Sequence, residues 1–493
     1  MSPLFLLLPI LLPILGGFLL IPWDPSSSKV RNCYAMAVVC LTSILVWTAL
    51  LTVGPAIGPE SIEVYSFTKG FSIRFGLDSL SMMFALLVSV MWPLVMLYAF
   101  DYMEHEEQAN GFFGFYVMTY GSTLGLAFAS NMTTIYVFIE MLTLVTIPLV
   151  TFYSNHDSMY AGRKYAAYTI GGASLGLFAV VVASLYGDAG NFAYGGILSG
   201  PYNPTVLQTA FLFGFFGFGV KAAVFPLHGW LPSASVAPTP VTALLHAVAV
   251  VNSGVFSIIR LTWYVYGPDF LRGTLCLKVA QAFVIFTLVY AAAAAVKERH
   301  FKRRLAYSTV ANLSYMLFGI LLMTPEGLEA GMLHMLFHSV IKITLFMCAG
   351  AFMHSTGNSY VYEVNGVGRR MRVTFIMYTC CALSLTGIPG LCGFVSKLHL
   401  VMSGLAEGSI LAFIGSAALM CAAFLCAIYT LTVSARAFFP MEGSSLYEEE
   451  GSAHEAHMMM LIPICAFTLI NVVCGIYPAP LIGLIGRIAR GLM

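Results

Sequence analysis

Long apolar runs separated by short polar stretches dominate the chain. A helix that crosses a bilayer needs about 20 mostly apolar residues, and the chain holds fourteen runs of this kind. The predicted spans are 2–22, 32–54, 79–100, 112–130, 131–153, 164–186, 206–227, 240–266, 274–296, 305–323, 330–354, 373–402, 410–439 and 457–480. The fourth and fifth runs are nearly continuous across the sequence ASNMTT. The pattern predicts an all-α, polytopic membrane protein of about fourteen transmembrane helices.

The polar stretches between the runs are short. The two longest insertions cover residues 55–78 and the acidic residues 441–457, and neither predicts a soluble domain. The first run, PLFLLLPILLPILGGFLLIPW, is longer than a signal-peptide core and lacks a basic leader and a small-residue cleavage site. We therefore expect it to be the first membrane span.

Basic residues in the loops predict an orientation. Short loops rich in lysine and arginine face the cytoplasm. The loops and span ends that follow odd-numbered spans hold thirteen basic residues, including Lys302, whereas those that follow even-numbered spans hold five, including Arg260. This asymmetry predicts a multi-pass protein of the cell inner (plasma) membrane, with both termini on the outer side.

Composition narrows the function classes. Hydrophobic residues make up 59% of the 493 residues and charged residues 9%, against about 25% charged residues in soluble proteins. A net charge of +1 and the absence of a basic recognition pattern argue against nucleic acid as a partner. The eleven cysteines show no C-x-x-C pair or cluster spacing. We expect no cofactor, no metal site and no catalytic residue.

Four charged residues fall well inside the predicted spans. They are Lys221, Lys342, Lys397 and Glu140, while the other lysines and arginines are assigned to loops, span ends and the C-terminal tail. A charge at the centre of a membrane helix costs about 2.5–3.5 kcal/mol on insertion scales. A purely structural ion pair is the alternative, but three cations and one acid do not cancel. The pattern therefore favours a functional role in moving ions.

A ladder of titratable residues surrounds one of these lysines. In HMLFHSVIKITLF, His334, His338 and Lys342 are each four residues apart, so they share one face of a helix, about 6 Å apart along its axis. Histidine exchanges protons near neutral pH, which suits a proton relay. A packed polar seam is the alternative, and the lack of a carboxylate or cysteine beside the histidines disfavours a metal site. His246, in the span 240–266, is a further titratable group.

Two spans carry helix breakers next to a lysine. Pro226 follows Lys221 by five residues, and in the span 373–402 Pro389 and Gly390 precede Lys397. A proline inside a helix frees a carbonyl, and such breaks are tolerated at membrane depth where protein or water satisfies the backbone. Paired broken helices point to a transport pathway built on inverted repeats.

The two breaks lie five spans apart, so the second has the opposite direction in the membrane. We therefore predict two inverted five-helix repeats, with the seventh and twelfth spans broken. The expected division is 1–111 for the first three spans, 112–270 and 271–440 for the repeats, and 441–493 for a loop and the last span.

Several stretches resemble one known family. They are YAFDYMEHEEQANGFFGFYVM, the region around Glu140, KAAVFPLHGWLPSASVAPTPVTALLHAVAVVNSGVF, KRRLAYSTVANLSYM, HMLFHSVIKITLFMCAGA and GIPGLCGFVSKLHL. They are similar to the antiporter-like subunits of respiratory complex I, of Mrp multisubunit sodium/proton antiporters and of membrane-bound hydrogenases. The similarity covers roughly the third to the thirteenth span, and the run from Lys221 to Gly254 is the most specific part.

The resemblance implies a proton-moving subunit with no redox centre of its own. It implies that Glu140 and Lys221 form a first pair and that Lys397 is the exit-side lysine. His246, His334, His338 and Lys342 would connect them. The expected partners are the other membrane subunits of the same complex, the lipid bilayer and protons, and Na⁺ transport stays open.

Some positions depart from the family pattern. Ile139 precedes the glutamate where the family often has tryptophan, and Asn252 stands where one subgroup has lysine. His246 is then the best substitute for the middle of the relay. Lys397 replaces the glutamate of one complex I subunit type and agrees with the others.

Two other function classes compete with this one. A stand-alone secondary transporter of a small solute also uses broken helices, but it needs a substrate-sized polar cluster instead of a thin line of titratable groups. A structural subunit would have no reason to retain the buried lysines. The host complex, whether dehydrogenase, hydrogenase or pure antiporter, is left open by the sequence.

Overall fold

A computed structural model describes residues 4–23, 27–53, 61–68, 70–187, 191–199, 201–440 and 453–492. The first elements are α1 (Leu4–Leu20), α2 (Ser28–Val53), β1 (Ser61–Thr68), β2 (Phe71–Gly76), α3 (Ser79–Tyr102), α4 (Ala109–Ala127), α5 (Met132–Val150), α6 (His156–Tyr186), α7 (Pro204–Gly219), α8 (Trp230–Ser233), η1 (Ala234–Val236), α9 (Thr239–Ala247) and α10 (Val250–Ile259). They are followed by η2 (Arg260–Tyr266), α11 (Pro268–Leu271), α12 (Leu275–Lys297), α13 (Phe301–Leu321), α14 (Pro325–Thr356), η3 (Val367–Arg369), α15 (Arg372–Thr386), α16 (Cys392–Glu407), α17 (Ile410–Phe438), α18 (Met458–Ile476) and α19 (Ala479–Ala489).

Apolar helices make up nearly all of the described structure. Within the described residues, nine helical segments are long and apolar enough to cross a membrane, and four shorter apolar helices accompany them. The chain is therefore a multi-pass membrane protein. The predicted division at ASNMTT is confirmed, because α4 ends at Ala127 and α5 begins at Met132. Most of the predicted polar insertion 441–457 lies outside the described residues.

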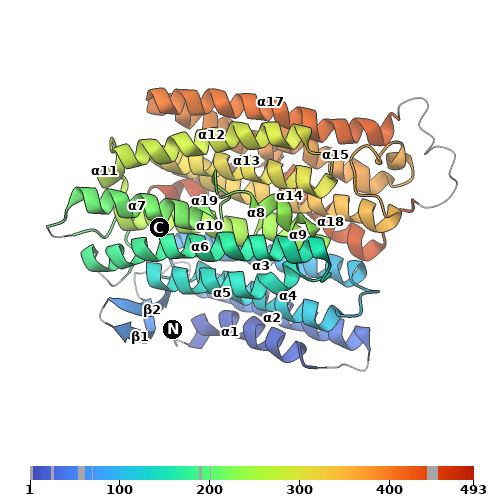
Figure 1. The fold of residues 1–493 in the computed structure, drawn as a ribbon, viewed down its shortest axis with the longest axis horizontal. Coiled ribbons are helices and arrows are strands. Elements are labelled where there is room, and N and C mark those ends of the chain that lie inside the picture. The colour runs from blue at the N-terminus through green and yellow to red at the C-terminus, as the bar shows by residue number, and fades with distance from the viewer. Residues whose placement is uncertain are drawn as a thin grey trace.

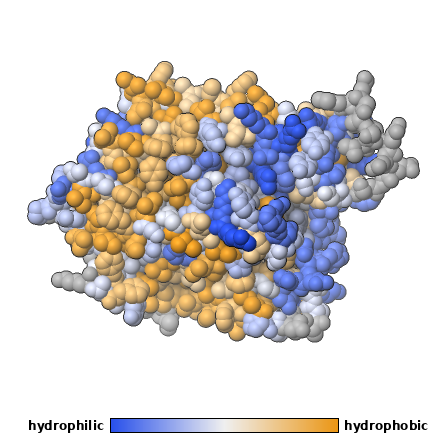
Figure 2. Space-filling view, viewed as in Figure 1, coloured by the Kyte–Doolittle hydropathy of each residue, from blue (hydrophilic) through white to orange (hydrophobic). Residues whose placement is uncertain are grey.

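The helices lie side by side along the longest axis of the molecule, with the β hairpin and α11 near the left-hand end of the view (Figure 1). In the same view, hydrophobic residues cover much of the body, and hydrophilic residues gather towards the right-hand end (Figure 2). An apolar body with a polar end is the surface expected of a helical bundle that faces lipid along its length.

The helices differ in how deeply they are buried. In the most apolar 18-residue stretch of each segment, all residues are buried in Thr239–Tyr266 and 94% in Pro325–Thr356, against 33% in Ile410–Phe438. The elements α9, α10 and α14 therefore form the centre of the protein, and α17 lies at its edge. The two central segments carry His246 and the predicted histidine ladder.

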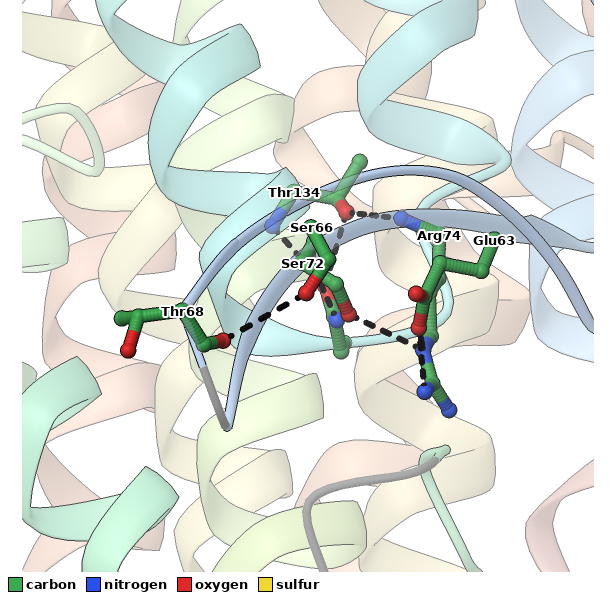
Figure 3. A network of polar contacts seen from close by, with 7 residues as sticks. Glu63, Ser66, Thr68, Ser72, Arg74 and Thr134 are labelled. Atoms are coloured by element: carbon green, nitrogen blue, oxygen red, sulfur yellow. Dashed lines mark hydrogen bonds and ion pairs between the residues drawn. The ribbon is translucent and has the colours of Figure 1, made fainter.

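A small antiparallel hairpin of β1 and β2 departs from the predicted all-α architecture. Polar and apolar residues largely alternate along its strands, as is typical of a β-strand. A search for long apolar runs does not detect this pattern. Arg74 donates from Nε to Glu63 at 2.9 Å, and the Arg74 backbone N–H donates to Thr134 Oγ1 at 2.8 Å (Figure 3). The hairpin is thereby fixed to the beginning of α5.

Both predicted helix breaks are confirmed. The helix α7 ends at Gly219 and α8 begins at Trp230, with Pro226 between them. The second break separates α15 from α16 and contains Pro389 and Gly390, the latter with φ of +90°. Glycine adopts this left-handed conformation without the steric cost that other residues incur.

A third interruption was not predicted. The sequence predicted one continuous span over 240–266, but α9 ends at Ala247, α10 begins at Val250, and the last part is a π-helix. The Leu244 carbonyl accepts from the backbone N–H groups of both Val248 and Ala249. The Asn252 side chain donates to the Ala247 carbonyl at 2.9 Å. The stretch has no proline at this point, so the polar Asn252 was the one available signal.

Candidate functional site

Lys221 lies in the first helix break and is 2% exposed. Its Nζ donates to Thr143 Oγ1 of α5 at 2.5 Å and to Tyr165 Oη of α6 at 3.4 Å. Gly254 lets α10 pack closely against this segment, because a Cβ there would lie 2.7 Å from the Lys221 Cβ. The buried ammonium is thus held by two hydroxyl groups from neighbouring helices.

Glu140 lies on α5, three residues before Thr143, and is partly buried. Among the described residues, its Oε1 has no hydrogen-bond partner, and no ion pair joins it to Lys221. Glu140 nevertheless lies nearly one helical turn before Thr143, whose hydroxyl accepts from Lys221 Nζ at 2.5 Å. The structure therefore brings Glu140 and Lys221 into one site without direct contact, and the hydroxyls of Thr143 and Tyr165 hold the lysine.

His246 occupies the last turn of α9 and is fully buried. Its ring stacks on Phe346 of α14, with the centroids 4.7 Å apart. Neither ring nitrogen has a hydrogen-bond partner among the described residues. The nearby Asn252 donates to Ser339 Oγ of α14 at 2.7 Å. The middle of the predicted relay is therefore a junction between the interrupted α9–α10 segment and α14.

The predicted ladder lies entirely within α14, and all three of its residues are buried. His334 contacts Ser396 Oγ through Nδ1 at 2.9 Å and Asn312 Oδ1 through Nε2 at 3.2 Å. The ring centroids of His334 and His338 lie 6.1 Å apart. Neither nitrogen of His338 has a partner among the described residues. The ladder thus places one anchored and one unanchored imidazole side by side.

The lysines of the second half contact main-chain carbonyl groups. Lys342 Nζ donates to the Leu305 carbonyl of α13 at 3.0 Å. Lys397 lies in α16, and its Nζ reaches back across the break to the carbonyls of Leu385 and of Thr386, the latter at 3.4 Å. In the described residues, no ion pair includes either lysine.

Among the described residues, three buried cations were not predicted: Arg31 is 7% exposed, and the other two are buried more deeply. Lys302 and Arg260 were assigned to the regions around loops, but Lys302 lies in α13 and Arg260 opens η2, and they are 4% and 1% exposed. Lys302 Nζ donates to the Ala237 carbonyl at 2.8 Å. Arg260 forms a bidentate ion pair with Asp78, the N-cap of α3.

The errors for Lys302 and Arg260 have different reasons. Lys302 lies in the first turn of α13, before the predicted span 305–323, so a search by hydropathy places it outside. Arg260 lies inside the predicted span 240–266, and its charge alone led to its assignment to the span end. The neighbouring sequence offered one signal for Lys302, namely its place in the resembling stretch KRRLAYSTVANLSYM.

The part of the chain that holds these residues matches a known protein family. Residues 129–425 match the family described as NADH:quinone oxidoreductase/Mrp antiporter, TM. Residues 65–113 match the family described as NADH-Ubiquinone oxidoreductase (complex I), chain 5 N-terminus. The first match covers more than half of the chain. The chain belongs to the NADH:quinone oxidoreductase/Mrp antiporter family. All seven candidate residues from Glu140 to Lys397 lie inside the segment that matches this family.

Curated relatives within the family include subunits of two kinds of complex. The chain is 29% identical over 441 residues to a Na⁺/H⁺ antiporter subunit of Alkalihalophilus pseudofirmus, which covers 83% of this chain and 53% of that protein. It is 29% identical over 454 residues to the chloroplastic NAD(P)H-quinone oxidoreductase subunit 5 of Piper cenocladum, covering 87% and 60%. The chain thus spans little more than half the length of these relatives.

Solved structures share the fold over nearly the whole chain. A chain of the Mrp complex from Dietzia sp. DQ12-45-1b superposes with a TM-score of 0.86 at 21% identity, covering 100% of this chain and 98% of that one. A chain of respiratory complex I from Thermus thermophilus gives 0.81 at 23% identity, covering 99% and 100%. At this level of identity the similarity concerns the fold, a mostly helical membrane fold of the predicted kind.

Proposed function

We propose that the chain is a proton-translocating, antiporter-like subunit of a larger membrane complex. The observation that carries this proposal is the series of buried titratable groups that runs from Glu140 and Lys221 through the central helices to Lys397. Membership of the NADH:quinone oxidoreductase/Mrp antiporter family supports it, as do the names of its relatives, which are subunits of a Na⁺/H⁺ antiporter and of quinone oxidoreductases.

In the first half, Glu140 and Lys221 act as a switch. A nearby carboxylate favours the charged form of a lysine, whereas burial favours the neutral form. When Glu140 is charged, Lys221 retains its proton against the hydroxyls of Thr143 and Tyr165. When Glu140 is neutralised or its side chain turns away, burial dominates, and Lys221 releases the proton towards the centre of the protein.

In the centre, the proton passes through imidazole groups. His246 and His338 lack fixed partners among the described residues, so each ring can take up a proton on one nitrogen and release it from the other. His334 is anchored between Asn312 and Ser396 and conveys the proton towards α16. Lys342 lies one helical turn before Phe346, on which the His246 ring stacks, and supplies a positive charge beside the relay.

The architecture proposed for this function has fourteen spans and two inverted repeats. The spans are α1 to α6, α7 with α8, α9 to η2, α12, α13, α14, α15 with α16, α17, and α18. The repeats cover 112–270 and 271–440, and each has a break in its fourth span. We place the protein in the plasma membrane with the loop between α12 and α13 in the cytoplasm, on the basis of the distribution of basic residues.

The partners that this function requires are the other membrane subunits of the complex, because the chain itself is proposed to carry protons and to receive its driving force from elsewhere. Solved complexes that contain chains with this fold include an Mrp complex, respiratory complex I and a membrane-bound sulfane sulfur reductase.

The test uses the whole complex reconstituted into liposomes that hold a pH-sensitive dye. A potassium diffusion potential drives protons inward, so the assay does not depend on the identity of the driving reaction. Replacing Lys397 by alanine removes the exit-side cation, and we expect the initial rate of proton entry to fall at least about tenfold, in the range of groups that transfer protons. A parental rate in an assembled Lys397→Ala complex would show that this line of residues is not the proton path.

A further inference from the structure

A second group of charged residues lies at the Pro325 end of α14, apart from the predicted ladder. Glu329 is on this first part of the helix, and its side chain is 10% exposed. Arg490, which follows α19, places Nη2 3.6 Å from Glu329 Oε2 and 3.8 Å from Glu326 Oε1. The Glu326 side chain is 60% exposed. One arginine therefore faces a buried and an exposed carboxylate.

The helix α19 covers the buried carboxylate closely. A Cβ on Gly486 would lie 2.9 Å from Glu329 Oε2, so the absence of a side chain there lets α19 pack directly over the acid. The distance from Arg490 to Glu329 exceeds that of a good charge-assisted hydrogen bond. The contact between Arg490 and Glu329 is thus a weak ion pair that can break and form again, and it requires the carboxylate to be ionised.

The register of two neighbouring helices connects Glu329 to the ladder. Helices α14 and α16 pack against each other, and His334 meets Ser396. From this point, Glu329 lies five residues along α14 towards Pro325, which is about 7.5 Å along the axis, and His399 lies three residues along α16, about 4.5 Å. Both steps lead towards the same end of the bundle, because a Cβ on Gly319 of α13 would lie 2.7 Å from Leu400 Cδ2, 2.7 Å from the Gly327 carbonyl oxygen and 3.0 Å from the Gly331 nitrogen.

His399 is suited to the step between them. It is half-buried, and its Nδ1 lies 2.8 Å from the Val395 carbonyl of its own helix. It lies on nearly the same face of α16 as Ser396, because three residues correspond to almost one helical turn. On α16, His399 therefore lies between Ser396, which marks the level of His334, and Leu400, which lies at the level of Gly327 and Gly331 beside Glu329.

We propose that His399 and Glu329 are the last proton-carrying groups between His334 and the surface, and that Arg490 closes this route. The inference rests on the proposed function. A proton that leaves the His399 ring forms an O–H bond on the Glu329 carboxylate. The neutral acid no longer attracts the guanidinium, so α19 loosens, and Glu329 then releases the proton to water and binds Arg490 again.

The test compares two neighbouring glutamates in the liposome assay of the whole complex. Glu329→Gln removes the proton carrier and should lower the initial rate of proton entry about tenfold. Glu326→Gln is the matched control, since Glu326 faces the same arginine from an exposed position, and its rate should stay within about twofold of the parent. Glu329→Asp keeps a carboxylate and should recover most of the rate, which a role in packing alone does not predict.

Removing the arginine tests the closing step separately. Arg490→Gln frees the Glu329 carboxylate, so proton entry should rise about two- to threefold, in proportion to a weak ion pair. Should Glu329→Gln fail to assemble, His399→Gln takes its place, with the same expected loss of about tenfold.

The outcomes separate this inference from the proposed function. If Lys397→Ala blocks proton entry while an assembled Glu329→Gln complex retains the parental rate, the outer route is wrong and the proton path stands. If Glu326→Gln loses as much as Glu329→Gln, the effect is one of surface charge, and the inference is equally overturned. A parental rate in Lys397→Ala refutes the proposed function itself.

Discussion

The two broken helices hold their lysines in different ways. Lys221 lies inside the first break, and its ammonium donates to the hydroxyls of Thr143 and Tyr165, with Glu140 nearby on α5. Lys397 lies after the second break, and its ammonium donates to main-chain carbonyls at the end of α15.

These two arrangements indicate how the proton affinity of a buried lysine can be made variable or kept constant. The last carbonyls of a helix have no partner within it, so those at the end of α15 are natural acceptors for Lys397. Their position is set by the backbone. The partners of Lys221 are side chains that rotate, and the charge beside it can be neutralised. We therefore expect the proton affinity of Lys221 to be regulated and that of Lys397 to stay constant.

The largest effect is expected at the regulated lysine. Lys221→Arg preserves the charge and its hydroxyl partners, but a guanidinium does not deprotonate in proteins. Proton entry into liposomes should therefore fall at least about tenfold, as after loss of a proton-transfer group. An arginine variant that transports protons as well as the parent would make Lys221 a fixed counter-ion and remove the contrast between the two breaks.

The next largest effect is expected where the two halves meet. Replacing both His334 and His338 by alanine removes the imidazoles that connect the centre to α16, and we expect a loss of about five- to tenfold in proton entry. Assembly is checked by the elution of the intact complex in size-exclusion chromatography. Unchanged transport in an assembled double variant would mean that the ladder is a packing seam.

A smaller effect is expected from the carboxylate. Glu140→Gln removes the charge that holds the proton on Lys221, and transport should fall about threefold to tenfold, the range of one partly buried charge interaction. The loss in proton entry caused by Glu140→Gln should change little with ionic strength, because charges inside the bundle are poorly screened by salt. Asp157, whose side chain is 79% exposed, provides the control. An equal loss of proton entry in Glu140→Gln and in Asp157→Asn would point to a general effect of surface charge.

The smallest effect is expected from the hydroxyls. Tyr165→Phe removes one acceptor at 3.4 Å and leaves Thr143 at 2.5 Å in place, so transport should change about twofold or less, as for one weak hydrogen bond. Thr143→Val should cost more than Tyr165→Phe in the same assay, because it removes the shorter contact. The reverse order would show that Tyr165 is the principal partner.

The fold could be predicted from the sequence to the extent that it depends on hydropathy and on helix breakers. The division between α4 and α5 and both breaks followed from such signals. The interruption after Ala247 did not, because it is created by tertiary contacts. Asn252, a polar residue in an apolar run, was a signal, but its contact with Ser339, 87 residues away on another helix, could not be predicted from the local sequence.

The burial of the candidate lysines and histidines could be predicted from the sequence, but their contacts could not. The spacing of His334, His338 and Lys342 was sufficient to place them on one face of α14. That Lys221 would be held by hydroxyls, and Lys397 by carbonyls, depends on which helices become neighbours. Lys302 was missed for the same reason, since its acceptor, the Ala237 carbonyl, is 65 residues away in the sequence.

The contacts of Lys302, Lys342 and Lys397 with main-chain carbonyls have a genetic consequence. A carbonyl oxygen belongs to every amino acid, so no codon change at Ala237, Leu305 or Leu385 deletes the acceptor. Substitution can vary these three sites only by replacing the lysine or by shifting the backbone through an insertion or deletion near a break. Substituting the acceptor residues one by one would therefore not remove the acceptors of these three lysines. It would remove those of Lys221, because Thr143 and Tyr165 accept through their side-chain hydroxyls.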